Sequence, residues 1–284
     1  MQDLTQIQFD DSSTSYIDVS KEFNDFLDFK GRDLILSTVD FHYVGFYKPF
    51  RQLYFDNPVK NTVVDLVMSY EYWNGSAWVT LPKIIDNTNA LSQSGFVYWS
   101  FPEDNKISDL WKENAIDGVT NYWIRIKTDN PISGTCDGIN IVYCDDTQLK
   151  AEVRNIQDYL YTDRLGVTDA SFINYHVAAR DDIVQTLRNG GDAVETINYK
   201  RNLSKWDLLE IGEVKQAAKY LTLSKIFLDN SLNVDDKNYQ RYREYLGKYG
   251  EAFKLYFMSI DKSDTGENTN DQKMDLNTIE IVRV

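Results

Sequence analysis

Cysteine and histidine are scarce in this 284-residue sequence, which contains two of each. Cys136 and Cys144 are too few for a disulfide framework and lack the paired spacing of a zinc site, so we expect two reduced thiols. His42 and His176 stand in different halves of the chain. This leaves no histidine pair for a metal and no obvious nucleophile–base dyad, and we expect both histidines to be structural.

Catalytic motifs are also missing. The sequence has no GxSxG elbow, HExxH pair, dinucleotide fingerprint or P-loop lysine, which argues against the commonest hydrolases, proteases and nucleotide-binding proteins. Carboxylates are abundant but form no specific pair, so glycosidase chemistry stays open without support. Asp261, Ser263, Thr265 and Gly266 fall near the first positions of a calcium loop, but Gln272 stands where a bidentate Glu is needed. We expect no enzymatic activity, no cofactor and no bound metal.

Long apolar runs are absent too. No stretch of about 18 apolar residues occurs, and the opening Met1-Gln2-Asp3-Leu4-Thr5 has neither a basic region nor an apolar one. We therefore expect no membrane span and no signal peptide, and a soluble protein that is made in a cytoplasm.

Positive charge is scarce in the first half. The net charge is −14; residues 1–146 hold 11 Lys and Arg against 22 Asp and Glu, whereas residues 147–284 hold 19 against 22. An acidic surface gains no counterion-release attraction for DNA, so a DNA-gripping role is not expected. DNA that slides past without being held remains compatible with this charge.

What the first half does contain is period-two hydrophobicity in β-branched and aromatic residues, with no long helix between the strands. Asn74-Gly75 accepts positive φ and predicts a tight hairpin between Trp73 and Trp78. Such strands favour an antiparallel β-sandwich of the jelly-roll or immunoglobulin-like kind. The expected strands are Leu34–Val39, Tyr43–Phe46, Gln52–Phe55, Val63–Tyr72, Trp78–Leu81, Phe96–Phe101, Tyr122–Lys127 and Ile139–Tyr143.

The period changes to that of a helix near Asp146, where we place a domain boundary. Leu149, Val153, Ile156 and Leu160 predict one helix, capped by Asp146 or Thr147. A second helix is expected from Thr168 or Ser171 to Asn189-Gly190-Gly191, with Ile173, Val177, Val184 and Leu187 facing inward. The predicted fold is thus α+β with two domains: a β-sandwich over residues 1–146 and a bundle of about four helices over residues 147–260.

The most regular apolar spacing runs from Ser204 to Ile260. Val214, Ala217, Ala218, Leu221 and Leu228 form one helical stripe. Asn230–Asn233 is a short link, which makes the next helix fold back antiparallel. Ser204 with Asp207 resembles an imperfect capping box. The second helix carries the packing stripe that we expect to be buried, at steps of three and four: Tyr239, Tyr242, Leu246, Tyr249, Phe253, Tyr256 and Ile260.

The last stretch, residues 261–284, is polar and acidic at first and ends in alternating apolar residues. Asp261 to Met274 cannot bury enough apolar area to order itself, so we expect a mobile linker. The ending resembles a strand without a partner, and such a segment can dock on a sheet edge or groove of another protein. Pairing with the protein's own sandwich is the alternative. The proposed docking residues are Ile279, Ile281, Val282 and Val284.

Four stretches of the second half are distinctive: Trp206-Asp-Leu-Leu209, Ala217-Ala-Lys-Tyr-Leu-Thr-Leu-Ser-Lys-Ile-Phe227, Tyr239-Gln-Arg-Tyr-Arg-Glu-Tyr245 and the acidic tail Asp261 to Asp271. In these the second half, about residues 147–284, resembles the head–tail connector (adaptor) proteins of tailed bacteriophages. The corresponding stretches of the first half are Tyr43–Phe50, Leu53–Asp56, Tyr72–Trp78 and Tyr122–Ile126. In these the first half resembles accessory sandwich domains of phage structural proteins, a domain that the smallest adaptors lack.

The resemblance implies a structural protein of the virion neck, assembled in the host cytoplasm. It implies a homo-oligomeric ring, twelve-fold to match the portal, which joins the portal to the next neck or tail-completion protein while DNA passes through the channel. A second hypothesis is a tail, baseplate or surface carbohydrate-binding module with a helical stalk. For that role Trp73, Trp78, Trp99, Trp111 and Trp123 would have to share one exposed face, although core packing suits their strand positions better.

Overall fold

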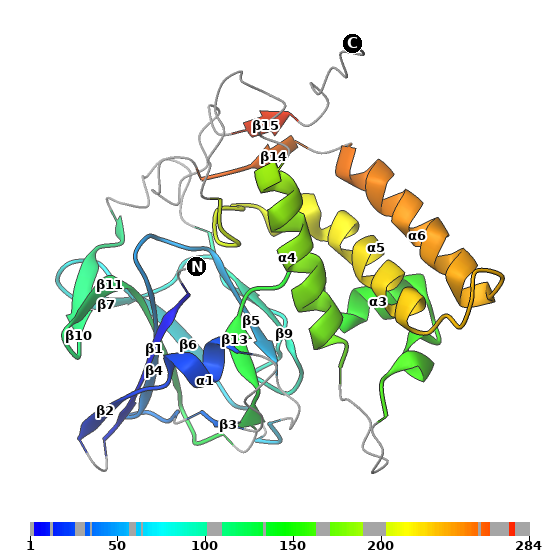
Figure 1. Ribbon diagram of the computed structural model, residues 1–284. Helices are drawn as coiled ribbons and strands as arrows, with labels where there is room; N and C mark the ends of the chain where they lie inside the picture. The colour runs from blue at the N-terminus through cyan, green and yellow to red at the C-terminus, as the bar shows by residue number, and fades with distance from the viewer. Residues whose placement is uncertain are drawn as a thin grey trace. The chain divides into compact units, whose positions relative to one another are not determined.

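The computed structural model describes residues 3–11, 14–25, 32–34, 36–56, 61–63, 65–100, 110–132, 135–162, 171–189, 203–254, 257–261 and 273–275 (Figure 1). They divide into two compact units, residues 3–141 and residues 142–261 with 273–275. The fold is α+β, with antiparallel sheets and with most of the described helices in the C-terminal half. The finer division into residues 1–146, 147–260 and 261–284 stays a prediction.

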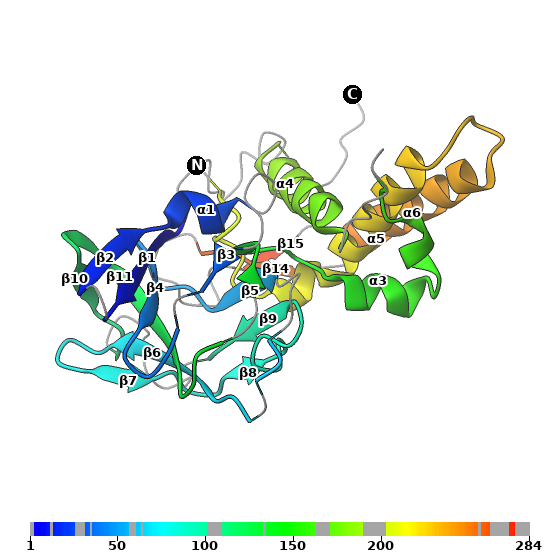
Figure 2. The same cartoon turned by 90° about the horizontal axis from the view of Figure 1, so that it is seen from below.

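The first unit contains a seven-stranded antiparallel sheet, whose strands lie side by side from β2 at one edge to β7 at the other (Figure 2). Its central pairs are β4 with β11 and β11 with β6. The strands in order of neighbours are β2 (Ser15–Asp18), β1 (Thr5–Asp10), β4 (Phe41–Phe46), β11 (Val119–Thr128), β6 (Met68–Trp73) and β7 (Trp78–Thr80), with β10 (Glu113–Ile116) also paired with β11.

A four-stranded antiparallel sheet, a two-stranded one and one short helix complete the described part of this unit. The four strands are β13 (Gly138–Asn140), β5 (Gln52–Asp56), β9 (Gly95–Tyr98) and β8 (Ile85–Asp86); the pair is β12 (Thr135–Cys136) with β3 (Arg32–Asp33); the helix is α1 (Ser20–Asn24).

The predicted hairpin at Asn74-Gly75 is confirmed. Trp73 pairs with Trp78, and Gly75 adopts a φ of +98°. Residues 74–77 separate this pair, and the N–H of Asn74 bonds the carbonyl of Ala77 across the loop at 3.1 Å. The Asn74 side chain accepts further bonds from the backbone of Ser76 and Ala77, which explains why this loop needs asparagine at its first position.

Several strand predictions differ from the structure. Of the expected Val63–Tyr72, the described residues form a strand only from Met68 onward, and the expected Ile139–Tyr143 ends as a strand at Asn140. The described residues of the expected strand Leu34–Val39 do not form a strand. Ser37 Oγ accepts bonds from the N–H groups of Val39 and Asp40 and so folds the chain into a turn. Strand β1 was not predicted, since Gln6 and Gln8 disguise its burial. The polar side chain of Gln6 can be buried because it is hydrogen-bonded: its amide nitrogen donates to the carbonyl of Ile139 at 2.8 Å.

The second unit holds the longer helices, and α5 lies at its centre between α4 and α6 (Figure 1). Helices α5 and α6 run antiparallel, as their short link predicts. The elements are α3 (Asp146–Glu152), a 3-10 turn η1 (Ile156–Tyr159), α4 (Ile173–Asn189), α5 (Ile211–Asp229), α6 (Lys237–Lys254) and the antiparallel strand pair β14 (Phe257–Ser259) with β15 (Lys273–Asp275).

The helix boundaries differ in detail from those expected. The first helix is capped by Asp145, whose side chain accepts from the N–H of Gln148, and it stops at Glu152 because Val153 is extended. In place of the single helix predicted to reach Leu160, the structure has α3 and the separate 3-10 turn η1. The Asp207 side chain accepts from the N–H of Ser204 at 2.5 Å, which is one of the two bonds of a capping box. This bond closes a turn and does not start a helix, because α5 begins only at Ile211.

The end of the chain also departs from the prediction. Helix α6 stops at Lys254, and Ile260 bridges Leu208 instead of extending a helical stripe. Asp261, expected in a mobile linker, is buried, and its N–H bonds the carbonyl of Asp207 at 2.8 Å. Met274, at the far end of that linker, lies in a strand that pairs with β14. The docking residues Ile279, Ile281, Val282 and Val284 lie outside the described residues.

Candidate functional site: the α5–α6 hairpin

Helix α5 is buried on several sides, which makes it the core element of the second unit. Its predicted stripe of Val214, Ala217, Ala218 and Leu221 is confirmed. Leu228, predicted in the same stripe, is instead 42% exposed in the last turn of the helix. The buried residues are Ile211, Val214, Ala217, Ala218, Leu221, Thr222, Leu223, Ser224, Ile226 and Phe227.

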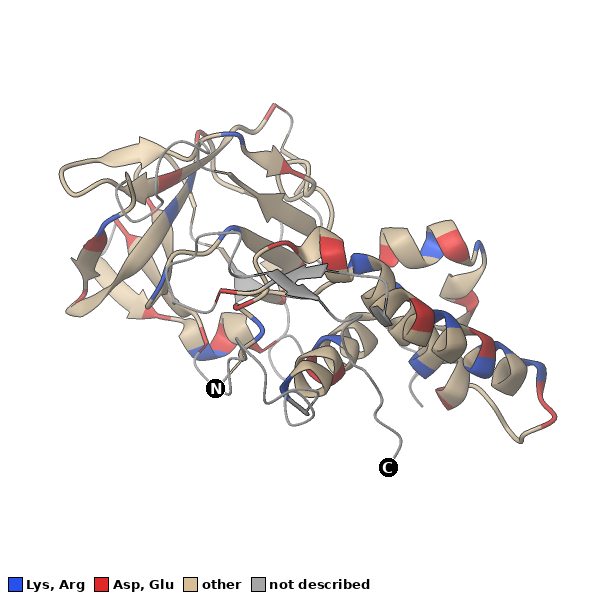
Figure 3. Ribbon diagram, turned by 90° about the horizontal axis from the view of Figure 1, so that it is seen from above, with Lys and Arg blue, Asp and Glu red and all other residues tan. Residues whose placement is uncertain are grey.

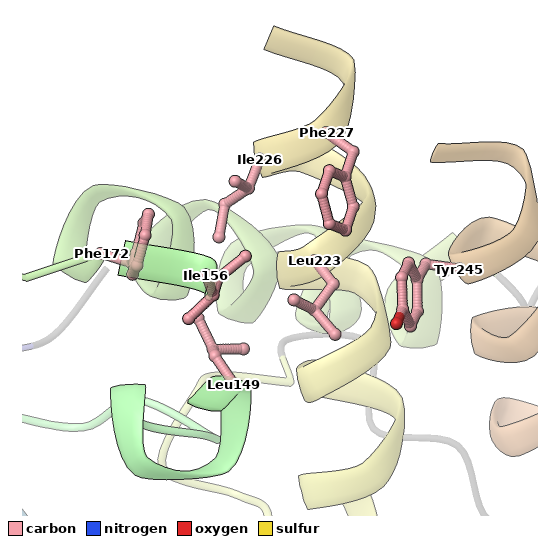
Figure 4. Close-up of a cluster of buried hydrophobic side chains, with 7 residues drawn as sticks. All are labelled: Leu149, Ile156, Phe172, Leu223, Ile226, Phe227 and Tyr245. Atoms are coloured by element: carbon pink, nitrogen blue, oxygen red, sulfur yellow. The ribbon is translucent and has the colours of Figure 1, made fainter. Parts of the chain in front are cut away.

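One apolar cluster ties α5 to the elements around it. Figure 4 shows side chains from α3, η1, α5 and α6, and from the residue before α4, pointing toward one another. Each fully buried aliphatic or aromatic side chain contributes about 1.5–3 kcal/mol of transfer free energy. The cluster therefore holds the α5–α6 hairpin against α3, η1 and the residue before α4. Its members are Leu149, Ile156, Phe172, Leu223, Ile226, Phe227 and Tyr245.

The packing stripe predicted for α6 is rotated by about one residue. Tyr245, only 7% exposed, and Ala252 are the buried positions of the helix. Leu246, predicted inward, is 39% exposed. Tyr239, Tyr242, Tyr249 and Phe253 are half-buried along the edges, and Tyr256 lies outside the described residues.

The cause of this rotation is the packing of polar and charged side chains over α5. The Tyr245 ring stacks on Phe227, with centroids 5.6 Å apart and an interplanar angle of 14°. The guanidinium of Arg241 lies 5.2 Å from the centre of the same Phe227 ring. Long basic side chains cover apolar surface with their stems, which a pattern of apolar residues does not reveal.

Ion pairs between helices reinforce the hairpin. Glu152 of α3 accepts a 2.8 Å bond from Lys219 of α5 and lies 3.6 Å from Lys248 of α6. The bond from Lys219 lowers the pKa of Glu152, against the effect of partial burial. Figure 3 shows acidic and basic residues interspersed along these helices. The hairpin surface is therefore mixed in charge.

The tip of the hairpin, residues 230–236, is held in one conformation by its own hydrogen bonds. Asp236 accepts from the N–H of Leu232 at 3.1 Å and from the N–H of Asn238 at 2.7 Å. These two backbone donors lower the pKa of the Asp236 carboxyl. Asn238 also donates its side-chain amide to the carbonyl of Asn230 at 2.9 Å, which closes the base of the loop.

The helical unit also contains a hydrogen-bonded cysteine–histidine–aspartate triad that was not predicted from the sequence, with Cys144 and His176 buried and Asp146 half-buried. Nδ1 of His176 lies 3.1 Å from Sγ of Cys144, and Nε2 lies 2.9 Å from Oδ1 of Asp146. The Cys144 sulfur also lies 3.4 Å from the hydroxyl of Thr222. Burial by itself lowers the pKa of His176, but Cys144 and Asp146 outweigh it and raise that pKa to about 10.

Cys144 and His176 have the atoms of a nucleophile–base pair, but the sulfur is not accessible to a substrate. Cys144 and His176 are both buried, so a substrate cannot reach the sulfur in this conformation. Asp146 also accepts from the N–H of Phe172, and so links the start of α3 to the start of α4. A structural tie is thus the role that the geometry supports. Asp146 and His176 lie 30 positions apart in the sequence, so no local spacing marks them as partners.

The other histidine, His42, is part of a buried network in the first unit. Its Nε2 lies 3.0 Å from the side-chain oxygen of Gln6, and the side-chain nitrogen of Gln6 donates to the side-chain oxygen of Asn24 at 3.1 Å. Burial lowers the pKa of His42 to about 3. The imidazole is therefore neutral and donates to Gln6, a structural role of the kind expected for both histidines.

The tryptophans do not share one exposed face, because Trp99, Trp111 and Trp123 are buried. Trp73 and Trp78 are half-buried, and they belong to a row of rings across the larger sheet. Its centroid distances are 4.9 Å, 6.3 Å, 5.7 Å and 5.6 Å along the series Phe9, Tyr16, Tyr43, Trp78 and Trp73, which we call the aromatic ladder.

Within the described ranges, no group of three or more His, Cys, Asp or Glu side chains is arranged to hold a metal ion. No helix in the same ranges combines the length and the apolar character required to cross a bilayer. Comparisons of the chain with protein-family models, with curated proteins and with solved structures found no match.

Proposed function

We propose that this chain is a structural head–tail connector of a tailed-phage neck. In this proposal twelve copies form a ring that docks on the portal, receives the next neck or tail-completion protein, and lets DNA pass through its channel. The observation that carries the proposal is the α5–α6 hairpin: an apolar α5 enclosed by its neighbours, with a tyrosine-rich α6 whose edges stay half-exposed. Half-exposed Tyr and Arg are typical of the residues that subunit interfaces bury.

The proposal extends to the finer fold. We propose that the two larger sheets of the first unit are the layers of a β-sandwich of the jelly-roll or immunoglobulin-like kind, and that α3 to α6 form a bundle. The burial of Trp99, Trp111 and Trp123 supports a shared aromatic core between sheets. The proposed C-terminal arm, with Ile279, Ile281, Val282 and Val284, would dock on the portal or on the next subunit.

No chemistry is required of this protein, and its charge suits a channel that DNA traverses. The first half is acidic, which discourages tight binding of nucleic acid. The buried Cys144–His176–Asp146 chain fits a load-bearing protein, because it ties α3, α4 and α5 together without exposing a reactive thiol.

Electron microscopy of the purified full chain, alone and mixed with the portal ring of the phage that encodes it, tests the proposal. We expect closed rings with a central channel, either free or on the portal. Single copies in both samples, with the portal rings intact, would overturn the ring.

The aromatic ladder favours a second candidate, a carbohydrate-binding module. Tyr16 is exposed, Trp73 and Trp78 are half-exposed, and flat rings in a row can stack on sugars. Glycan-array binding by the full chain that is lost in Trp73→Ala and Trp78→Ala, but kept in Tyr161→Ala, would support this candidate. Equal signals for all variants would remove it.

A further inference from the structure

The tip of the α5–α6 hairpin displays apolar side chains in an otherwise polar loop. Leu232 is 92% exposed and Val234 is 66% exposed, and Leu228 is also exposed, in the last turn of α5. We call these three residues the hairpin knob. Single exposed apolar residues are common on protein surfaces, but three within seven positions at the end of one hairpin are a local concentration of apolar side chains that water solvates poorly.

The loop that carries the knob is closed by hydrogen bonds within the chain itself. The bonds from Leu232 and Asn238 to Asp236 fix its middle and its end, and the N–H of Asp235 donates to Asn233 at 3.0 Å. A side chain presented by an ordered loop loses little conformational entropy on binding. The hydrogen-bonded loop therefore presents the knob in a conformation suited to docking on another surface.

The outer face of α6 offers a complementary surface. Leu246 is exposed there, and Arg243, also exposed, lies three residues before it and so on the same side of the helix. The knob is flanked by exposed acids, Asp229 and Asp235. Arg243, beside Leu246, is thus opposite in charge to the two acids beside the knob. The helical half of the chain, with 19 basic and 22 acidic residues, is close to neutral. Net charge therefore causes little repulsion between the helical halves of two copies.

We infer that the hairpin knob of one copy packs against the outer face of α6, at Leu246 and Arg243, in a second copy of this chain. The two surfaces are different patches of one subunit, so the contact is heterologous and can propagate around a ring. This inference rests on the ring of the proposed function and names the contact that closes it. Asp235 would meet Arg243, while Leu232 and Val234 would cover Leu246.

A photocrosslinking amino acid at position 232 of the full chain tests the contact. We expect a crosslinked dimer whose joined peptide contains residues 243–248 of the second copy. The matched control carries the same amino acid at Gln185, an exposed position on α4, and should give no such product. Crosslinks to any other segment, or none, would overturn the inference.

A charge exchange gives an independent test by sedimentation velocity. Asp235→Arg or Arg243→Glu alone should weaken self-association by about tenfold or more, and the double variant should restore most of it. Both side chains are exposed, so melting temperatures should not change. Unchanged association in the single variants, or a chain that stays monomeric at every concentration, counts against the contact. Rings that survive these changes would leave the neck function standing without this interface.

Discussion

Nε2 of His176 lies 2.9 Å from Oδ1 of Asp146, and this contact joins the first turn of α4 to the first residue of α3. The carboxylate also accepts from the N–H of Phe172, just before α4. One side chain therefore orients the imidazole and anchors the start of a helix. On the other side of the imidazole ring, Nδ1 lies 3.1 Å from Sγ of Cys144, which precedes α3 in the same unit.

The state of this imidazole is a first prediction. With the pKa of His176 raised to about 10, the ring should stay protonated at pH 8. Asp146→Asn removes the charge of one partner and should bring the pKa down toward 6.5. Histidine ring chemical shifts followed by NMR from pH 5 to 9 measure this directly. A ring that titrates near 6.5 in the unmodified protein would contradict the assignment.

His42 should make the first unit less stable in mild acid. Its pKa is lowered to about 3, below the ordinary 6.5, so between these values the unfolded chain binds a proton that the folded chain does not. The free energy of unfolding is therefore not reduced by His42 above pH 6.5. As the pH falls from 6.5 toward 3, it decreases by about 1.4 kcal/mol per pH unit. Denaturant unfolding at pH 5 to 6.5 should show a steeper loss in the unmodified protein than in His42→Gln. Equal slopes would refute the role of burial.

Two neighbouring residues of α6 should respond very differently to truncation. Tyr245→Ala removes a ring stacked on Phe227 and should cost about 3–5 kcal/mol of unfolding free energy, whereas Leu246→Ala should cost about 1 kcal/mol or less. Urea unfolding of both variants decides. A larger loss for Leu246 would restore the stripe that the apolar spacing alone predicts.

Two glycines should respond with opposite signs to the same change. A Cβ at Gly45 would collide with the Trp123 ring, so Gly45→Ala should destabilise the protein by about 1–3 kcal/mol. A Cβ at Gly247 meets nothing within 4 Å in the interior of α6, so Gly247→Ala should stabilise the fold by up to about 1 kcal/mol. Melting curves check both, and a loss of stability in Gly247→Ala would contradict the open surface beside it.

The sequence predicted those elements whose burial is apolar and periodic. The Asn74-Gly75 hairpin, the apolar stripe of α5 and the antiparallel return of α6 follow from local rules of spacing and turn chemistry. Leu246 was misplaced because it continues the steps of three and four from Tyr242 to Tyr249. In the structure Tyr245 and the stem of Arg241 cover the apolar surface of α5 instead.

Contacts between distant polar residues were out of reach of pattern analysis. Gln6 and His42, or Cys144 and His176, meet only after the chain has folded, and nothing in their spacing marks them as partners. The hairpin knob was also missed, since Leu232 and Val234 stand in a loop where no period applies and only their exposure distinguishes them.

Cryo-electron microscopy of intact virions tests the central claim most directly. The account predicts density for twelve copies of this chain between the portal and the tail, into which α3 to α6 fit as a ring around the channel. Density for the chain at a baseplate or fibre tip, or virions that lack it, would contradict a neck connector.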